Sequence, residues 1–216
     1  MSRPIIIIDG IDGSGKSTFA RGLAAALATQ GVRTVPISVD DFRRPVDWAA
    51  VASEPDAYYD GYYDLVRAGE VLEAFRSGAP AADLPRFDPV AERIAGSRRV
   101  AFEGADAVIL EGVFPLRVPG AAGALAIYLD TSAALARRRI VERDLRKGRT
   151  CEEIERRIDR RYAPGQRRYH AAIDPRGRAD VIVDNEDPAA PRCLRRELSR
   201  VPAELRPRLD RALPPG

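Results

Sequence analysis

One nine-residue segment near the N-terminus constrains this chain more than any other feature. Gly10-Ile11-Asp12-Gly13-Ser14-Gly15-Lys16-Ser17-Thr18 has the spacing G-x-x-x-x-G-K-[ST] and directly follows the apolar run Ile5–Ile8. In this pattern the glycines let backbone N–H groups approach an anion, the lysine reaches the phosphates, and the serine hydroxyl binds Mg²⁺. The segment therefore predicts a site for ATP or GTP with Mg²⁺, formed by Gly10 and residues 12–18, with Ser17 as a metal ligand.

The sequence around this segment supports the same interpretation. A strand before the loop and a helix from about Gly15 to Gln30 are the context that the motif requires. Lysine occurs only at Lys16 and Lys147, so a match by chance is uncommon. The alternative is a glycine-rich turn between a strand and a helix that binds no ligand.

Composition excludes several other classes. The chain has 216 residues, of which 45% are hydrophobic and 31% charged, as in a globular α/β domain. No apolar stretch approaches the roughly 18 residues that span a bilayer, and two cysteines form no disulfide framework. A net charge of +3 without basic blocks interleaved with aromatics argues against nucleic acid. We expect a cytoplasmic protein whose partner is a small molecule; assembly into a homo-oligomer is left open.

Short apolar runs separated by helical patterns predict the fold. Expected strands are Ile5–Asp9, Thr34–Val39, Asp106–Gly112, Ala124–Asp130 and Ala179–Asp184. Crossover helices between parallel strands give a three-layer α/β sandwich of the phosphate-loop type, with helices on both faces of a mostly parallel sheet. One kinase-like domain is expected over residues 1–188. Residues 189–216 are expected to form a tail rich in Pro and Arg, with a helix near 192–200.

Acidic residues follow two of these strands at the sheet edge that carries the phosphate loop. Asp40 and Asp41 follow the second strand, and Glu111 ends the third. A carboxylate at this edge can accept a proton from a substrate hydroxyl or hold Mg²⁺. Asp40 is thus the candidate general base and Glu111 a candidate metal ligand; a solvated turn is the alternative for Asp40 and Asp41. If the strand continues through this pair, Asp41 should face away from the crevice.

Aromatic residues are concentrated in a short segment after the second strand. Trp48, Tyr58, Tyr59, Tyr62 and Tyr63 lie within sixteen residues, and their spacing predicts a helix from about Tyr59 to Arg76. Such a stripe either packs in the core or stacks on a flat substrate ring.

Two further segments favour a substrate-binding insertion and a lid. Residues of about 84–104 resemble a short hairpin with long loops. In about 137–150, Arg139, Arg143 and Arg146 have the i, i+4, i+7 spacing of one helix face. An arginine-bearing lid over the transferred phosphate requires such a face, whereas a solvated basic helix is the alternative. A charged helix is expected over Cys151–Tyr169, and His170 is expected to be a surface or packed residue.

The ordered set of these motifs resembles the uridine kinase, phosphoribulokinase and pantothenate kinase group. The resemblance rests on Asp9–Thr18, Ser38–Phe42, Glu54–Asp60, Leu110–Val113, Leu129–Thr131 and Ala179–Ile182, and it covers about residues 4–186. It implies a kinase that transfers the γ-phosphoryl group to a small-molecule hydroxyl, first of all the 5′-hydroxyl of a nucleoside.

The resemblance also implies roles for individual residues. Lys16, Asp40, Arg139 and Arg143 would be catalytic, with Asp40 as the base and the arginines in the lid. The substrate would contact Asp40, Phe42, Asp56, Tyr58, Phe87, Glu92 and Arg149, with Asp56 at the ribose. This chain has Arg43, Phe87 and Glu92 where the group usually has Tyr, Tyr and His. Because an ionised glutamate accepts but cannot donate, an amino-bearing base such as cytosine should be preferred to uracil.

Other functions differ in the acceptor or in the absence of catalysis. Ile8–Gly13 is also similar to thymidylate kinase, but Asp159-Arg160-Arg161-Tyr162 has one residue too many for the Asp-Arg-Tyr motif of that family. Another small alcohol such as pantothenate is a second alternative. A nucleotide-binding module without enzymatic activity is a third, since a fold alone does not fix a function.

Overall fold

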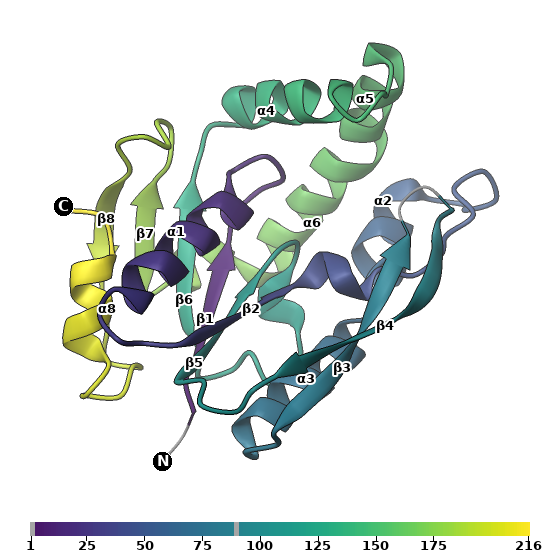
Figure 1. The fold of residues 1–216 in the computed structure, drawn as a ribbon. Coiled ribbons are helices and arrows are strands. Elements are labelled where there is room, and N and C mark those ends of the chain that lie inside the picture. The colour runs from purple at the N-terminus through teal and green to yellow at the C-terminus, as the bar shows by residue number, and fades with distance from the viewer. Residues whose placement is uncertain (1–2, 89–90) are drawn as a thin grey trace.

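The computed structural model describes residues 3–88 and 91–216. Met1 and Ser2, at the start of the expected domain, and Pro89 and Val90, within the expected hairpin, lie outside the described residues. Over the described ranges the centre is a six-stranded sheet with the order β2-β5-β1-β6-β7-β8 (Figure 1). Its strands are β1 (Ile5–Asp9), β2 (Thr34–Ser38), β5 (Ala107–Glu111), β6 (Leu125–Asp130), β7 (Val181–Asp184) and β8 (Arg192–Arg196).

The first five strands of the sheet are parallel, as predicted, and β8 is antiparallel to β7. Both Ile8 of β1 and Ser38 of β2 pair with Glu111 of β5. The carboxyl ends of these three strands therefore meet at one edge, which is where ligands bind in open parallel sheets.

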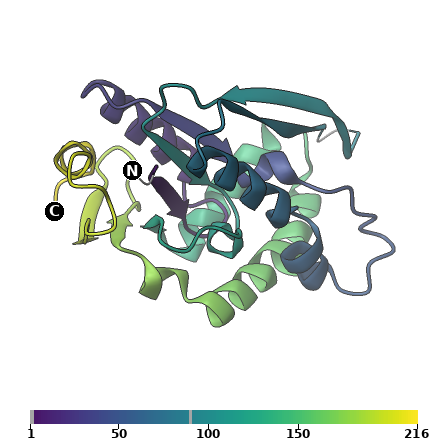
Figure 2. The same ribbon diagram turned by 90° about the horizontal axis from the view of Figure 1, so that it is seen from below.

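Alternating isoleucines in β1 place a hydrophobic core on each face of the sheet. Ile5 and Ile7 pack with residues of α3 (Leu65–Arg76) and α6 (Ala163–Ile173). Ile6 and Ile8 pack with residues of α1 (Lys16–Ala28) and α8 (Arg206–Ala212). Successive side chains of a strand point to opposite faces, so one short apolar strand contributes to both cores. This is the three-layer sandwich that the sequence predicts, and Figure 2 shows it from below.

The chain forms α-helices and, between some of its helices and strands, short turns of other helical types. The α-helices are α1 (Lys16–Ala28), α2 (Glu54–Asp56), α3 (Leu65–Arg76), α4 (Ala133–Leu145), α5 (Cys151–Arg157), α6 (Ala163–Ile173), α7 (Pro175–Arg178) and α8 (Arg206–Ala212). Turns of 3₁₀-helix occur at Val39–Phe42 and Pro115–Arg117, and π-helical turns at Ala57–Gly61 and Ile158–Tyr162.

The predicted hairpin is present and separate from the main sheet. β3 (Ala81–Asp88) and β4 (Arg93–Ala101) form a two-stranded antiparallel ribbon that extends along one side of the molecule (Figure 1). Its strands are longer than the sequence suggested, and β3 begins three residues before the expected boundary at residue 84.

The second strand is shorter than predicted, because the chain turns at Ser38. The Ser38 hydroxyl accepts a hydrogen bond from the Asp40 amide at 3.3 Å, and residues 39–42 form a 3₁₀ turn. A serine side chain that binds a nearby amide competes with continuation of a strand. Asp40 and Asp41 therefore lie on a helical turn. The strand does not continue through this pair, so the alternation of strand side chains cannot be used to predict which way Asp41 faces.

The predicted helix over Tyr59–Arg76 is divided in two. A π-helical turn ends at Gly61, and α3 begins at Leu65, where the Asp64 side chain accepts a hydrogen bond from the Arg67 amide at 3.0 Å. Between them Tyr63 pairs with Arg43 in an isolated antiparallel bridge. This pairing with a distant segment overrides the local helical periodicity.

The expected helix over Cys151–Tyr169 is likewise divided into α5, the π-helical turn 158–162, and α6. Pro164 lies in the first turn of α6 and has no N–H to donate, so the regular α-helical hydrogen bonding is interrupted just before it.

The C-terminal residues are part of the folded structure. The helix expected near 192–200 is wrong, because Arg192–Arg196 form the edge strand β8. The helix in this region is α8, whose Leu209 is fully buried in the core that α1 also covers. Over residues 3–88 and 91–216, no helix has the length and apolar character needed to cross a membrane.

Candidate active site

The loop between β1 and α1 has a backbone shape that depends on glycine. Gly13 and Gly15 have φ values of 82° and 94°. A Cβ atom on Gly13 would lie 2.3 Å from the carbonyl oxygen of Ala136, so α4 packs directly on the loop. The first amides of α1 have no acceptor within the helix and are available to an anion. The residues predicted to bind phosphate thus form one continuous cradle at the sheet edge.

Lys16 lies at the start of α1 with its ammonium group inside this loop. Its side chain donates hydrogen bonds to the carbonyl oxygens of Gly10 and Ile11, both at 2.8 Å, and the residue is 7% exposed. An ammonium group has three donors, so it can be shared between these carbonyls and a bound phosphate.

Ser17 and Glu111 are 94 residues apart in the chain but lie in contact in the folded protein. The Ser17 hydroxyl donates a hydrogen bond to Glu111 Oε2 at 2.9 Å. Burial raises the pKa of Glu111, and hydrogen bonds to Ser38 and Ser17 act in the opposite direction. One hydroxyl and one carboxylate suit Mg²⁺, which usually keeps several waters and binds substrate phosphates. No group of three or more metal-ligating side chains occurs within the part of the chain that the structure describes.

The two carboxylate oxygens of Asp40, the candidate general base, have different surroundings. Its Oδ2 atom forms an ion pair with Arg43 Nη2 at 2.5 Å, while its Oδ1 atom is buried and has no hydrogen-bond partner among the described residues. Burial acts against the charge of Arg43, but the adjacent Asp40 carboxylate holds the pKa of Arg43 above its ordinary value. The carboxylate is therefore anchored by Arg43 through one oxygen, while its other oxygen is covered by neighbouring atoms and accepts no hydrogen bond from the described residues.

Asp41 has a different partner from its neighbour. Its Oδ2 atom accepts a hydrogen bond from Arg98 of β4 at 2.6 Å. This pair links the 3₁₀ turn to the hairpin, and about half of the Arg98 side chain is exposed. Within residues 3–88 and 91–216, Asp40 is the only aspartate or glutamate with a buried and unpartnered oxygen.

The arginines of the predicted lid have different partners. Arg139 donates to the carbonyl oxygens of Asn185 at 3.0 Å and Glu186 at 2.9 Å, beside the phosphate loop. Arg146, the residue that caps α4, is exposed and donates to the carbonyl oxygen of Glu142 one turn earlier at 3.0 Å. The i, i+4, i+7 spacing of Arg139, Arg143 and Arg146 lies on one continuous helical segment, and their role in a lid stays a prediction.

Arg143 and Arg149 are held together by Asp144, which the sequence analysis did not identify. Asp144 is 1% exposed; it accepts a hydrogen bond from Arg143 at 2.7 Å and forms an ion pair with Arg149 at 3.0 Å. Although burial opposes it, hydrogen bonding and charge from Arg143 lower the pKa of Asp144. A buried carboxylate thus positions two cations at the end of α4.

The candidate substrate contacts are dispersed. Phe42 is fully buried in the core, so its side chain does not line the crevice as expected. Asp56 pairs with Arg168 at 2.7 Å on the surface. Tyr58 is buried and donates its hydroxyl to Asp12 at 2.9 Å, so it supports the phosphate loop. In the hairpin, Phe87 is partly buried opposite Ile94, and Glu92 is exposed at the turn with φ of 48°.

Most of the aromatic cluster belongs to the core. Tyr58, Tyr59 and Tyr63 are at most 8% exposed and pack around Phe114. Tyr62 is only partly buried and contacts Trp48 edge-on at 5.0 Å. Tyr62 and Trp48 are the partly buried rings of this cluster, and the guanidinium group of Arg161 lies over the Trp48 ring at 3.3 Å.

Comparison with known proteins places this geometry in a family. The chain matches the Phosphoribulokinase / Uridine kinase family over residues 5–188. The chain belongs to this family. It is 34% identical over 133 residues to a pantothenate kinase of Sorangium cellulosum (strain So ce56), which is 58% of this chain and 42% of that protein. This chain thus covers less than half of that relative's length.

Solved structures of similar fold agree with the family. A candidate uridine kinase from Bacillus stearothermophilus superposes with a TM-score of 0.64 at 22% identity, covering 84% of this chain and 89% of the other. A candidate fructose transport system kinase from Silicibacter sp. TM1040 gives a TM-score of 0.65 at 24% identity, covering 79% and 85%. At these identities the likeness concerns the fold alone: an α/β phosphate-loop kinase fold.

Two side chains that contact the phosphate loop or the end of β1 were missed by the sequence analysis and come from distant segments. Asn185, directly after β7, donates to the carbonyl oxygen of Ser14 at 2.6 Å. Its place at the carboxyl end of a parallel strand was a usable signal. Tyr169 of α6 donates to Asp9 at 2.5 Å, and no local pattern marks it as different from other helical tyrosines.

A cavity of about 630 Å³ opens beside the phosphate loop on the side of α1. Its lining comes from the loop and α1 (Gly15, Thr18, Phe19, Gly22, Leu23), from Arg139, Asn185, Pro188 and Pro191, and from the C-terminal residues Ala212, Leu213 and Pro214. The C-terminal segment therefore contributes to a wall next to the predicted nucleotide site.

Proposed function

We propose that this protein is an ATP-dependent kinase that transfers the γ-phosphoryl group to a hydroxyl of a small molecule, with the 5′-hydroxyl of a nucleoside as the first acceptor class. The observation that carries the proposal is the convergence of Lys16, the Ser17–Glu111 pair and Asp40 at one edge of the sheet. Family membership over residues 5–188 supports the same class of reaction.

The residues of this chain suggest how the transfer proceeds. The acceptor hydroxyl gives its proton to the Asp40 carboxylate as its oxygen bonds to the γ-phosphorus, and the bond to the β,γ-bridging oxygen breaks to release ADP. Lys16 and the amides of the loop hold the phosphates, and Arg143 stabilises negative charge that develops on them. Mg²⁺, held by Ser17 and Glu111, would neutralise part of the charge of the phosphates.

The cavity of about 630 Å³ beside Gly15 and Thr18 is the proposed place of the nucleotide base. It has the size of ordinary small-molecule sites, and its walls are largely apolar. Arg139 lies at its border and is fixed by the carbonyl oxygens of Asn185 and Glu186, so we assign it to nucleotide binding as well as to the lid.

A nucleoside acceptor is supported by Tyr62, an aromatic ring that is only partly buried and would suit contact with a flat base. Glu92 at the hairpin turn would accept a hydrogen bond from an amino group, so cytidine should be a better acceptor than uridine.

A second candidate is an acceptor that carries a carboxylate, such as pantothenate. Arg43 and Arg157 each have a buried Nε atom without a partner in the described ranges, and Arg43 is next to the candidate base. Guanidinium groups with unused donors suit a carboxylate. The relative from Sorangium cellulosum bears the name pantothenate kinase.

The test is transfer from radiolabelled ATP, with Mg²⁺ present, to uridine, cytidine, thymidylate, pantothenate and fructose in parallel. We expect one acceptor to be phosphorylated with kcat/KM at least roughly 10⁴ M⁻¹s⁻¹, as for a typical enzyme with its substrate. Asp40→Asn is the control that separates enzymatic transfer from contamination. Preferred transfer to thymidylate would indicate a nucleotide kinase, and ATP binding without transfer to any acceptor of a broad panel would support a binding module.

A further inference from the structure

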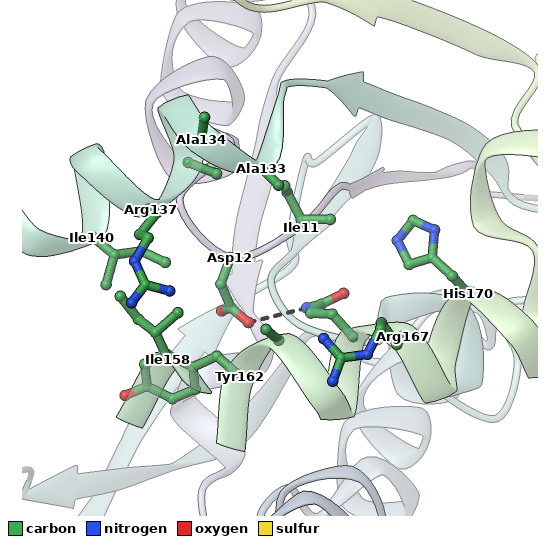
Figure 3. A pocket seen from close by; sticks show the side chains of 13 residues that line it. Ile11, Asp12, Ala133, Ala134, Arg137, Ile140, Ile158, Tyr162, Arg167 and His170 are labelled. Carbon is green, nitrogen blue, oxygen red and sulfur yellow. Dashed lines mark hydrogen bonds between the residues drawn. The ribbon is translucent and has the colours of Figure 1, made fainter. Parts of the chain in front are cut away.

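A second cavity lies on the other side of α4 from the proposed base site. Its volume is about 640 Å³, and it is bordered by the phosphate loop, α4, and the helical segment from Ile158 to His170 (Figure 3). It is lined by Ile11, Asp12, Ala133, Ala134, Ala136, Arg137, Ile140, Ile158, Tyr162, Ala163, Gln166, Arg167 and His170. Lys16, Ser17, Asp40 and Glu111 are not among these residues, so this cavity lies beside the proposed reaction site and shares only Ile11 and Asp12 of the phosphate loop with it.

Most of the cavity wall is hydrocarbon. Three isoleucines and four alanines contribute it, and the alanines are small enough to leave room for a ligand between the helices. Pockets of a few hundred Å³ with mainly apolar walls and a small number of polar groups are typical of sites for organic molecules.

One buried polar atom in this wall has no partner. Gln166 is 6% exposed, and its Nε2 atom donates to Asp12 Oδ2 at 3.1 Å. Because a carboxylate only accepts, this bond fixes which end of the amide faces Asp12. The Oε1 atom is left buried without a hydrogen bond within residues 3–88 and 91–216. A buried acceptor without a donor is costly, so a ligand N–H or O–H would be stabilising here.

Arg167, the residue after Gln166, adds a positive charge to the wall of this cavity. Arg167 is exposed and forms no ion pair or hydrogen bond among the described residues, and His170 follows it on the same helix. Figure 3 shows both side chains on the α6 side of the cavity. By contrast, Arg137 is paired with Asp159 at 2.7 Å and also with Glu155. The free positive charge of the cavity is therefore that of Arg167.

We propose that this cavity binds an amphipathic organic anion. Its apolar body occupies the space between Ile11, Ile140 and Ile158, an N–H or O–H group donates to Gln166 Oε1, and one anionic group pairs with Arg167. The cavity adjoins the phosphate loop through Ile11 and Asp12, but Arg167 and most of the apolar wall lie outside the residues proposed to bind the nucleotide and the acceptor. The proposal does not depend on the identity of the acceptor.

The dye 8-anilinonaphthalene-1-sulfonate is a suitable probe, since it combines an aromatic body, one N–H donor and one sulfonate. We expect saturable binding with one site and a Kd of about 1–100 µM, measured by fluorescence on the full folded chain. Ala134→Phe, which fills the cavity from an exposed position of α4, should abolish binding. Arg167→Gln should weaken it by at least about fivefold.

Arg160→Gln is the matched control, because Arg160 is an exposed arginine in the same helical segment but does not line the cavity. It should bind the dye like the unmodified protein. Ala163→Leu is a second filling variant, and circular dichroism verifies that each variant is folded. Saturating ADP with Mg²⁺ should leave dye binding unchanged. The proposal is overturned by absence of binding at about 200 µM dye, by equal affinity in the folded filling variants, or by competitive displacement with ADP.

Discussion

Tyr169 on α6 donates its hydroxyl to the carboxylate of Asp9 at 2.5 Å, joining two residues that are 160 positions apart in the chain. Asp9 is the last residue of β1 and is 2% exposed, and its Oδ1 atom also accepts from the Gly10 amide at 2.6 Å. The helix on one face of the sheet is thereby tied to the strand that leads into the phosphate loop.

This buried carboxylate makes stability depend on pH. Burial raises the pKa of Asp9 from 3.8 to about 6, against the opposing effects of Tyr169, Gly10 and Lys16. The folded state therefore retains a proton that the unfolded state loses as the pH rises. The contribution of Asp9 to stability is fully present below about pH 4 and is lost as the pH rises through about 6.

Asp9→Asn should remove this dependence. The free energy of unfolding of the variant, relative to the unmodified protein, should rise between about pH 4 and pH 7 by up to the order of 3 kcal/mol. Urea unfolding followed by circular dichroism at a series of pH values measures it. Parallel stability profiles for the two proteins would contradict the assignment, and Tyr169→Phe, which removes a donor to the carboxylate, should shift the transition to higher pH.

Lys16→Ala should abolish phosphoryl transfer, because the lysine is the phosphate-contacting cation of the loop. The loss of two hydrogen bonds to the carbonyl oxygens of Gly10 and Ile11 should lower stability by roughly 1–3 kcal/mol while the fold is kept. Arg160→Ala is the control, since Arg160 is an exposed cation outside the phosphate loop and the predicted lid. A Lys16→Ala variant with near-normal turnover would refute the loop assignment.

Asp40→Asn should reduce kcat by about 10²–10⁴-fold, the usual contribution of a general base, while ATP binding is largely kept. Asp41→Asn should be much milder, because the pair of Asp41 with Arg98 is partly exposed and such pairs contribute little. Steady-state transfer to the best acceptor and a separate nucleotide-binding titration measure both. The reverse order of severity would show that Asp41 is the base.

Arg143→Ala should lower kcat by roughly 10²-fold with a smaller effect on ATP affinity, as expected for a charge that stabilises the transition state. Arg139→Ala should also weaken nucleotide binding, since Arg139 connects α4 to the carbonyl oxygens beside the proposed base cavity. Steady-state kinetics and calorimetric titration with ADP separate the two effects. Arg160→Ala, in the helical segment that follows, is the control. If it caused equal losses, the effect would come from the positive charge of the region as a whole and not from a lid.

Gly22→Phe should weaken ADP binding at least about tenfold if the base occupies the cavity beside α1. An added Cβ at Gly22 has no neighbour within 4 Å, so the substitution fills the cavity without strain in the helix. Ala25→Phe, at an exposed position one turn further along α1, is the control and should bind ADP normally. Unchanged affinity in both variants would place the base elsewhere.

The sequence by itself determined the parts of this protein that depend on local geometry. The spacing from Gly10 to Thr18 defines the phosphate loop, because glycine at fixed positions allows a backbone that other residues cannot adopt. Short apolar runs such as Ile5–Ile8 and Val108–Leu110 specify buried parallel strands, since both faces of each strand are covered. Glu111 could be expected near Ser17, because the carboxyl ends of parallel strands share an edge.

Only the tertiary structure decided what depends on contacts between segments. Asp40 lies on a 3₁₀ turn with a fixed partner, Asp144 holds two arginines, and residues 192–196 form an edge strand where local composition suggested a helix. The cavity at Gln166 exists because α4 and α6 pack on the phosphate loop from different parts of the chain. The cavity depends on segments more than a hundred residues apart, whereas the edge strand and the pairs of Asp40 and Asp144 depend on how nearby segments turn back on one another. Periodicity along one segment contains no information about either kind of contact.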